Sequence, residues 1–160
     1  MIDMPWEDVE TCCMTLFNSI QQQQLKFDKI VGISRGGLIP ATCMGYLLSL
    51  PVTSLQWQTR SLNTNQDFVS LNSLLDKKDR LLIVDNIIDS GRTFYEIMCH
   101  ILFNRPAYPL NNIVFSALLK RKKQDYSLPN SMLVIIGNEI ENGPWVNFPW
   151  DNINRHKQEE

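Results

Sequence analysis

The segment that most constrains the fold is a run of four apolar residues, Leu-Leu-Ile-Val, at positions 81–84. A half-exposed strand alternates apolar and polar side chains, whereas this run is apolar at every position. Such a strand is buried on both faces, which is typical of the middle of a parallel sheet. We therefore expect a central strand here, in a sheet whose two faces are both covered by helices.

Strand-like and helix-like segments alternate along the rest of the chain. Apolar residues recur at three- and four-residue steps between Trp6 and Ile20, which predicts a helix. Apolar runs bounded by glycine, proline or charged residues predict strands. The expected strands are residues 30–33, 52–57, 81–84, 113–119 and 132–136, and the expected helices are residues 6–20, residues 38–48 and a helix that begins at Thr93.

This alternation predicts an α/β fold with a mostly parallel, twisted sheet flanked by helices. Of the 160 residues, 44% are hydrophobic and 20% are charged, which is ordinary for one domain with a single core. We therefore expect a single domain over residues 1–160. Residues 58–68 have little apolar content, and we expect them to form a mobile loop.

Charge and composition exclude several classes of function. The net charge is −2, so the chain has no overall basic field to hold nucleic acid. No apolar run approaches the roughly 20 residues that span a bilayer, and the first residues lack a secretion-signal pattern. The four cysteines have no C-x-x-C spacing, which favours reduced thiols. We expect a cytoplasmic protein that binds neither nucleic acid nor a membrane.

Two loops concentrate the glycines. They contain Gly32, Gly36, Gly37 and Gly91, four of the seven glycines in the chain. Each loop follows a predicted strand and leads into a helix, whose first N–H groups have no partner within the helix. Glycine lets such a backbone approach an anion closely. In the first loop Arg35 adds a guanidinium fork suited to a diphosphate, although a surface arginine in a tight turn is the alternative.

The second loop, residues 85–93, combines hydrogen-bond acceptors with donors. Asp85 and Asn86 can accept hydrogen bonds from sugar hydroxyls, whereas Ser90, Thr93 and neighbouring N–H groups can surround a phosphate at the helix start. A sugar that carries a phosphate matches both halves of the loop. The alternative is a plain strand-to-helix turn in which these polar residues are caps.

The helix after this loop has its own start signal. Thr93 and Glu96 match the T-x-x-E capping box, in which the two side chains bond to each other's backbone N–H groups. Phe94, Ile97 and Ile101 supply the apolar stripe that such a helix buries.

The two loops resemble the motifs of one enzyme family. Residues 81–93 resemble the phosphoribosyl diphosphate signature of type I phosphoribosyltransferases, and residues 31–41 (VGISRGGLIPA) resemble their diphosphate loop. Residues 5–7, Lys120 and residues 145–151 further resemble the bacterial xanthine-guanine phosphoribosyltransferases, over nearly the whole chain. The resemblance implies that ribose 5-phosphate passes from phosphoribosyl diphosphate to a 6-oxopurine (guanine, xanthine or hypoxanthine), with Mg²⁺ bound and diphosphate released.

The resemblance also implies a role for each matched residue. Asp89 would be catalytic, taking or holding the proton of the purine's imidazole nitrogen. Lys120 would donate to the exocyclic oxygen of the base, Trp145 would stack on the purine, and the Val146 backbone would meet its opposite edge. Asp85 would bind the metal. The residues implied to bind phosphoribosyl diphosphate are Ser34, Arg35, Gly36, Gly37, Asp85, Asn86, Asp89, Ser90, Gly91, Arg92 and Thr93.

Further expectations follow from the same resemblance. Residues 137–151 would form a small C-terminal hood over the base, the Ser34–Arg35 peptide bond would be cis, and the chain would form a homo-oligomer, a dimer or tetramer. Without the family, residues 120–123 predict a solvated basic turn, and Trp145 is equally suited to plugging the core.

The sequence departs from the family pattern at two places. Asn86 stands where relatives usually carry a second acid, and residues 59–62 lack the serine-tyrosine pair of the relatives' mobile loop. Arg60 is a candidate to contact the diphosphate in their place. These departures leave two alternatives open: a regulatory protein that binds phosphoribosyl diphosphate with weak or no activity, and a transferase acting on another nucleobase. Asp89, Lys120 and Trp145 favour a purine enzyme, because a regulator has less need of base-side residues.

Overall fold

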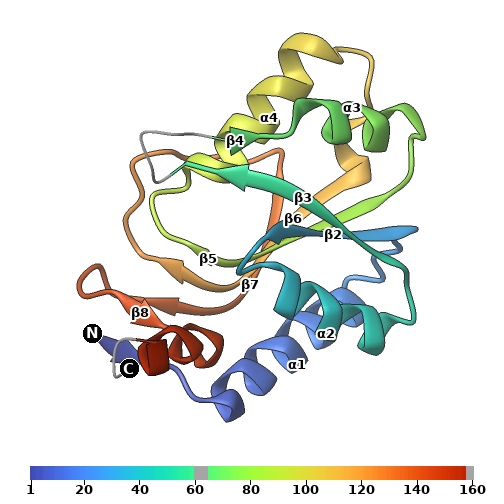
Figure 1. The fold of residues 1–160 in the computed structure, drawn as a ribbon. Coiled ribbons are helices and arrows are strands. Elements are labelled where there is room, and N and C mark those ends of the chain that lie inside the picture. The colour runs from blue at the N-terminus through green and yellow to red at the C-terminus, as the bar shows by residue number, and fades with distance from the viewer. Residues whose placement is uncertain (60–64, 158–160) are drawn as a thin grey trace.

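A computed structural model describes residues 1–59 and 65–157, and a six-stranded sheet forms its centre (Figure 1). The strand order is β4-β3-β2-β5-β6-β7, and the pairs are parallel except β3 with β4. The α/β fold with a mostly parallel sheet is confirmed. The strands are β2 (Lys29–Ser34), β3 (Val52–Gln58), β4 (Asn65–Gln66), β5 (Leu81–Ile88), β6 (Ile113–Arg121) and β7 (Leu133–Ile140).

Helices cover both faces of this sheet. Helices α1 (Trp6–Gln22) and α2 (Leu38–Leu48) lie on one face, and α3 (Phe68–Asp76) and α4 (Arg92–Asn104) lie on the other (Figure 1). A short 3₁₀ helix, η1 (Leu110–Asn112), precedes β6. The predicted helices over 6–20 and 38–48 are confirmed.

The central strand β5 shows why the sheet needs both layers. Its first four side chains, at residues 81–84, are fully buried. Leu82 and Val84 belong to the core cluster under α1 and α2, whereas Leu81 and Ile83 belong to the cluster under α3 and α4. The apolar run at residues 81–84 therefore supplies both cores.

Strands β5, β6 and β7 extend further than the sequence predicts. Strand β7 continues to Ile140, so residues 137–140, which were expected to belong to the hood, are part of the main sheet. Asp85, Asn86, Ile87 and Ile88 belong to β5 rather than to a loop, and the strand pairs with β6 as far as Ile88. The backbone hydrogen bonds of a neighbouring strand extend β5 beyond its apolar run. Strand β6 likewise continues to residue 121, so the expectation that its first lysine lies past the strand is wrong.

The predicted capping box is also wrong. The residue before α4 is Gly91, which provides no side-chain cap, and the helix begins at Arg92. The Glu96 carboxylate does not turn back to a cap but accepts hydrogen bonds from Trp57, Gln66 and Arg92. The predicted apolar stripe of this helix is buried, as expected.

The segment between β3 and β5 contains elements that the sequence did not predict. Helix α3 forms there, with Asp67 accepting a hydrogen bond from the Ser70 N–H at its start. Within the expected loop at 58–68, residues 65–66 form strand β4 against β3. Residues 60–64 of that loop lie outside the described residues.

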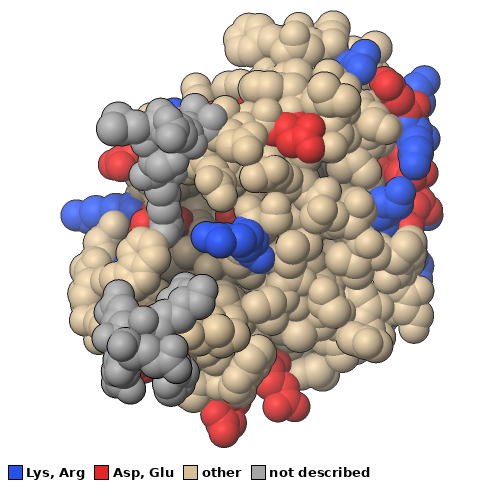
Figure 2. Space-filling view, viewed as in Figure 1, with Lys and Arg blue, Asp and Glu red and all other residues tan. Residues whose placement is uncertain are grey.

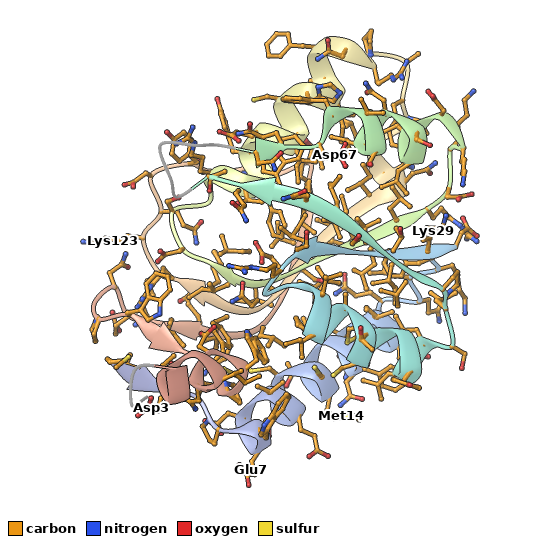
Figure 3. All side chains as sticks on the ribbon, in the orientation of Figure 1. Asp3, Glu7, Met14, Lys29, Asp67 and Lys123 are labelled. Carbon is orange, nitrogen blue, oxygen red and sulfur yellow. The ribbon has the colours of Figure 1, made fainter. Side chains whose placement is uncertain are left out.

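A second, two-stranded sheet joins the two ends of the chain. Strand β1 (Ile2–Asp3) pairs in parallel with β8 (Val146–Asn147), which leads to the 3₁₀ helix η2 (Pro149–Lys157). Figure 1 shows the N-terminus and η2 beside this sheet, and Figure 3 labels Asp3 within it. The N-terminal segment thus supports the segment expected to be the hood.

Two expectations about the chemistry of the chain can be compared with the structure. All four cysteines are free thiols, as expected. Among the described residues, no helix is both long enough and apolar enough to cross a bilayer.

Candidate functional site

A cleft of about 580 Å³ opens at the carboxyl ends of β2, β3 and β5. In open parallel sheets this edge is where loops lead into helix N-termini, and it is the usual position of ligand sites. Figure 2 shows a hollow in this region with basic atoms at its rim and acidic atoms further inside. Both glycine loops and the hood contribute to the walls of the cleft. The predicted residues that line it are Ser34, Arg35, Gly36, Asp85, Asn86, Asp89, Ser90, Gly91, Arg92, Thr93 and Trp145.

The first loop leaves β2 through a cis peptide bond between Ser34 and Arg35, as expected. The Arg35 side chain is exposed, and Gly37 is buried behind it. A Cβ atom at Gly37 would lie 2.5 Å from the Val84 carbonyl oxygen. Glycine at position 37 therefore lets the first loop lie against the end of β5, although Gly37 itself does not line the cleft.

The end of β5 presents two oxygen-bearing side chains to the cleft. The Asn86 N–H donates to Asp85 Oδ1 at 2.8 Å. The Asn86 amide packs against the first loop, since a Cβ atom at Gly36 would lie 2.8 Å from its Nδ2 atom. The acceptors predicted for a sugar therefore lie beside the loop predicted for a diphosphate.

The second loop forms an N–H-rich turn before α4. Gly91 has φ +83°, in the left-handed region that favours glycine. The Arg92 N–H donates to Ser90 Oγ at 3.3 Å, and the hydroxyls of Thr93 and Thr59 are 3.5 Å apart. A helix N-terminus with N–H groups, two hydroxyls and a positive dipole end is suited to a phosphate.

The Glu96 carboxylate organises the far wall of the cleft. It accepts from Trp57 Nε1 at 3.0 Å, from Gln66 Nε2 at 3.2 Å and from Arg92 Nε at 2.7 Å. Burial raises the pKa of Glu96, but the hydrogen bonds from Trp57, Arg92 and Gln66 outweigh it and lower the pKa overall. The carboxylate thus stays ionised and joins β3, β4 and α4. The sequence suggested a capping role for Glu96 and did not indicate this one.

The hood side of the cleft contains several aromatic rings. Trp145 is 56% exposed and lines the cleft, so it is not a core plug. Phe148 and Trp150 stack on each other at 4.9 Å, and Trp150 packs against Trp6 of α1. The Asp151 carboxylate accepts from the Phe148 N–H at 3.0 Å and so fixes the start of η2.

Two residues predicted to meet the base do not line the cleft. Val146 is buried in β8, as part of the core under α1 and α2. Lys120 lies within β6, with its Nζ atom 3.9 Å from a Glu139 carboxylate oxygen. Arg60, predicted to contact the diphosphate, lies outside the described residues.

Arg121 is a site residue that was not predicted from the sequence. It is 4% exposed, and its Nε atom donates to Asp89 Oδ1 at 3.1 Å. The expectation that residues 120–123 form a solvated turn is therefore wrong at this position. No signal in the sequence separates Arg121 from its basic neighbours.

Together, a parallel sheet with two anion-suited loops at its carboxyl edge defines a phosphate-binding α/β protein. The chain belongs to the phosphoribosyl transferase domain family, which it matches over residues 5–152, and it is accordingly a phosphoribosyltransferase.

Individual relatives and structures agree with this family. A xanthine-guanine phosphoribosyltransferase of Cereibacter sphaeroides is 27% identical over 128 residues, which are 76% of this chain and 68% of the relative. A hypothetical protein from Neisseria gonorrhoeae with bound ppGpp has a TM-score of 0.76 at 20% identity, covering 98% of this chain and 93% of that one. A Helicobacter pylori xanthine-guanine-hypoxanthine phosphoribosyltransferase has a TM-score of 0.65 at 14% identity, covering 99% of both chains.

Proposed function

We propose that this protein transfers ribose 5-phosphate from phosphoribosyl diphosphate to a ring nitrogen of a 6-oxopurine, in purine salvage. The observation that carries the proposal is that one cleft is lined by both anion-suited loops, by Asp89 and by Trp145. The relative from Cereibacter sphaeroides, which bears the name of a xanthine-guanine enzyme, supports a 6-oxopurine as acceptor.

The two loops divide the phosphorylated sugar between them. Residues 90–93 at the start of α4 bind the 5-phosphate, and Arg35 with the N–H groups of its loop binds the diphosphate. Asp85 and Asn86, which lie between the two loops, accept hydrogen bonds from the ribose hydroxyls. Breaking the bond at the anomeric carbon builds positive charge on the sugar and negative charge on the leaving diphosphate. This arrangement complements both charges.

The base lies on the hood side of the cleft. One imidazole nitrogen forms the new bond to the anomeric carbon as the bond to diphosphate breaks, and Asp89 takes or holds the proton of the imidazole ring. Trp145 stacks on the purine, an interaction worth on the order of 1–3 kcal/mol per base in nucleic-acid complexes. Lys120 and the Val146 backbone are proposed to meet the base edges, which requires movement in β6 and β8 since neither lines the cleft.

The donor set at the end of β5 fits Mg²⁺. Magnesium takes one or two carboxylates together with substrate phosphates and water, and it does not need a cage made wholly of protein. Asp85 would supply the carboxylate and Asn86 a weaker amide oxygen. A Mg²⁺ ion held there would supply positive charge that stabilises the leaving diphosphate. A cytoplasmic location and a homo-oligomeric assembly remain predictions from the sequence.

The direct test is a spectrophotometric assay with phosphoribosyl diphosphate, Mg²⁺ and each of guanine, xanthine and hypoxanthine. We expect turnover with at least one base. Asp89→Asn should slow transfer by about 100-fold or more, while the Kd of phosphoribosyl diphosphate stays within about threefold. Equal losses in transfer and in donor binding would argue against a base-side role for Asp89.

A second candidate is a regulatory protein that uses the same cleft without turnover. Asn86 in place of a second acid favours it, and so does the bound ppGpp in the Neisseria gonorrhoeae structure of the same fold. No turnover with any base, together with micromolar binding of phosphoribosyl diphosphate or ppGpp in calorimetry, would select this candidate. Turnover with a pyrimidine alone would instead indicate a transferase for another nucleobase.

A further inference from the structure

We infer that Arg121 is a positioning residue that fixes Asp89 and the hood relative to each other. The inference rests on the proposed function, because it assigns the purine to the part of the cleft between Asp89 and Trp145. It concerns a side chain that lies behind this part of the cleft rather than in its wall.

The burial of Arg121 is the first observation. Its side chain is 5% exposed, whereas the side chains of Lys120 and Lys122 on either side are 31% and 50% exposed. A buried guanidinium is costly unless its N–H groups are paired. Arg121 therefore needs the three acceptors around it, and these acceptors come from two different parts of the site.

The three hydrogen bonds are the second observation. Arg121 Nε donates to Asp89 Oδ1 at 3.1 Å, Nη1 donates to the Glu141 carbonyl at 2.8 Å, and Nη2 donates to the Pro144 carbonyl at 2.7 Å. The guanidinium is planar and rigid, so it fixes the three acceptors relative to one another. Because Trp145 follows Pro144, one planar group links the proposed catalytic carboxylate to the proposed stacking residue.

The residues after Arg121 fasten the hood without using Asp89. The Lys122 side chain pairs with the Glu141 carboxylate, and the Lys123 backbone exchanges hydrogen bonds with the Asn142 side chain. In Figure 3 the side chain of Lys123 points away from the molecule. Lys122 is thus a matched control: it is basic, adjacent and bonded to the hood, but it is exposed.

A purely structural arginine would not separate the two substrates kinetically. If Arg121 holds the purine side, its loss should reduce kcat/KM for the purine and spare the binding of phosphoribosyl diphosphate, which is proposed to use Arg35 and residues 90–93. Lysine should not rescue the function, because a single ammonium on a flexible stem cannot hold three acceptors in one plane.

The experiment compares wild type with Arg121→Gln, Arg121→Lys and Lys122→Gln. We expect kcat/KM for guanine to fall about 100-fold in Arg121→Gln and at least tenfold in Arg121→Lys. The donor Kd of both variants should stay within about threefold of wild type. In the control Lys122→Gln, both kcat/KM for guanine and donor Kd should stay within about threefold of wild type. If Arg121→Gln does not fold, Arg121→Lys, which keeps the charge, carries the test. Equal losses for purine and donor would overturn the inference.

A double-mutant cycle tests whether Arg121 acts through Asp89. In an Asp89→Asn background the Arg121→Lys change should cost at least about threefold less than it does in wild type, because the carboxylate it positions is already gone and only its bonds to the hood remain. Independent, multiplicative losses would show that Arg121 only supports the fold, which contradicts the inference.

The two levels of proposal can fail separately. If wild type turns over no purine, the proposed function fails, and the affinity for guanosine monophosphate by calorimetry then tests Arg121. A loss of about tenfold or more in Arg121→Lys, with Lys122→Gln unchanged, would still support the positioning role. Equal affinity in wild type and Arg121→Lys would overturn it.

Discussion

Asn86 determines how much negative charge the end of β5 presents to the proposed metal–diphosphate substrate. Its backbone N–H donates to the Asp85 carboxylate, and its carboxamide lies against Gly36. An amide oxygen accepts hydrogen bonds as a carboxylate does, but hard cations bind it more weakly. The site can therefore accept hydrogen bonds at position 86, but it carries one negative charge fewer than it would with aspartate there.

Asn86→Asp should strengthen metal-assisted binding of the donor. We expect the Mg²⁺ concentration for half-maximal activity to fall about three- to tenfold, because a second carboxylate joins Asp85. The measurement is a magnesium titration of the transfer rate at fixed phosphoribosyl diphosphate. An unchanged midpoint would place the metal away from the end of β5.

The absence of a Cβ atom at Gly91 determines the backbone geometry of the second loop. It has φ +83°, and a Cβ atom there would lie 2.2 Å from the Tyr126 carbonyl oxygen. Gly91→Ala should cost about 1–2 kcal/mol for the left-handed conformation alone, with the clash in addition. Donor affinity should fall with it, because the N–H groups before α4 move.

Gly143→Ala is the matched control for stability, since a Cβ atom at Gly143 meets nothing within 4 Å. Denaturant unfolding of the two variants measures the difference in the free energy of unfolding. Equal effects of the two alanines would contradict the strain argument.

At the scale of elements, Glu96 holds β3, β4 and α4 together. Trp57 is 3% exposed and directs its N–H at the Glu96 carboxylate, so loss of that carboxylate weakens a buried hydrogen bond. Hydrogen bonds that involve a charged group contribute about 1.5–3 kcal/mol. Strands β3 and β4 are thereby tied to α4, the helix that follows the second loop.

Glu96→Gln should destabilise the protein in a pH-dependent way. The pKa of Glu96 is lowered in the folded state, so the stability it adds is present above its unfolded pKa of about 4.3 and is lost as pH falls through the lowered value. We expect a loss of about 1–3 kcal/mol at pH 7 that shrinks below about pH 4. Unfolding curves at several pH values measure it, with the exposed Glu10→Gln as control. If the loss in the free energy of unfolding does not change with pH, Glu96 does not stabilise the fold as an ionised carboxylate.

The elements also show what could be predicted from the sequence. The apolar run at 81–84 predicts a central strand because a half-buried strand would alternate. The end of that strand was not predictable in the same way, since its apolar run is interrupted by the polar residues 85 and 86, and β5 continues past them because it pairs with β6. Helix α3 is nine residues long, too short to be stable alone, and depends on burial of Leu71 and Leu75.

Within the site, motif residues were predictable and supporting residues were not. Each of the two loops carries a recognisable sequence motif, so Arg35 and Ser90 could be assigned to one cleft from these motifs. Arg121 could not, because its partners Asp89 and Pro144 are 32 and 23 residues away along the chain and no local pattern links them. The spacing of Glu96 from Thr93 predicts a helix cap, whereas two of the groups that donate to its carboxylate lie on β3 and β4.

At the scale of the whole molecule, the first strand of the chain supports the hood. The Ile2 N–H donates to the Trp145 carbonyl at 2.8 Å, and Asn147 Nδ2 donates to Asp3 Oδ1 at 2.7 Å. The backbone of the proposed stacking residue is therefore held from one side by Ile2, and that of Pro144 from the other by Arg121.

Ile2→Pro should weaken the purine side of the cleft selectively. Proline removes the N–H that donates to Trp145 and keeps the chain length. A lost hydrogen bond of about 1 kcal/mol corresponds to roughly a fivefold rise in KM for the purine, with donor Kd unchanged. Steady-state kinetics measure it against Ile2→Val, which keeps the N–H. Identical kinetics in the two variants would mean that β1 does not influence the hood.

The pairing of β1 with β8 also bears on the order in which the site forms during synthesis. Residue 2 is synthesised well before its strand partner, residue 146, so the two cannot pair until residue 146 has left the ribosome. Both anion loops are synthesised more than 50 residues earlier. A growing chain thus holds the loops proposed to bind a sugar phosphate well before it can form the proposed base site, and the hood side is the last part of the cleft to be completed.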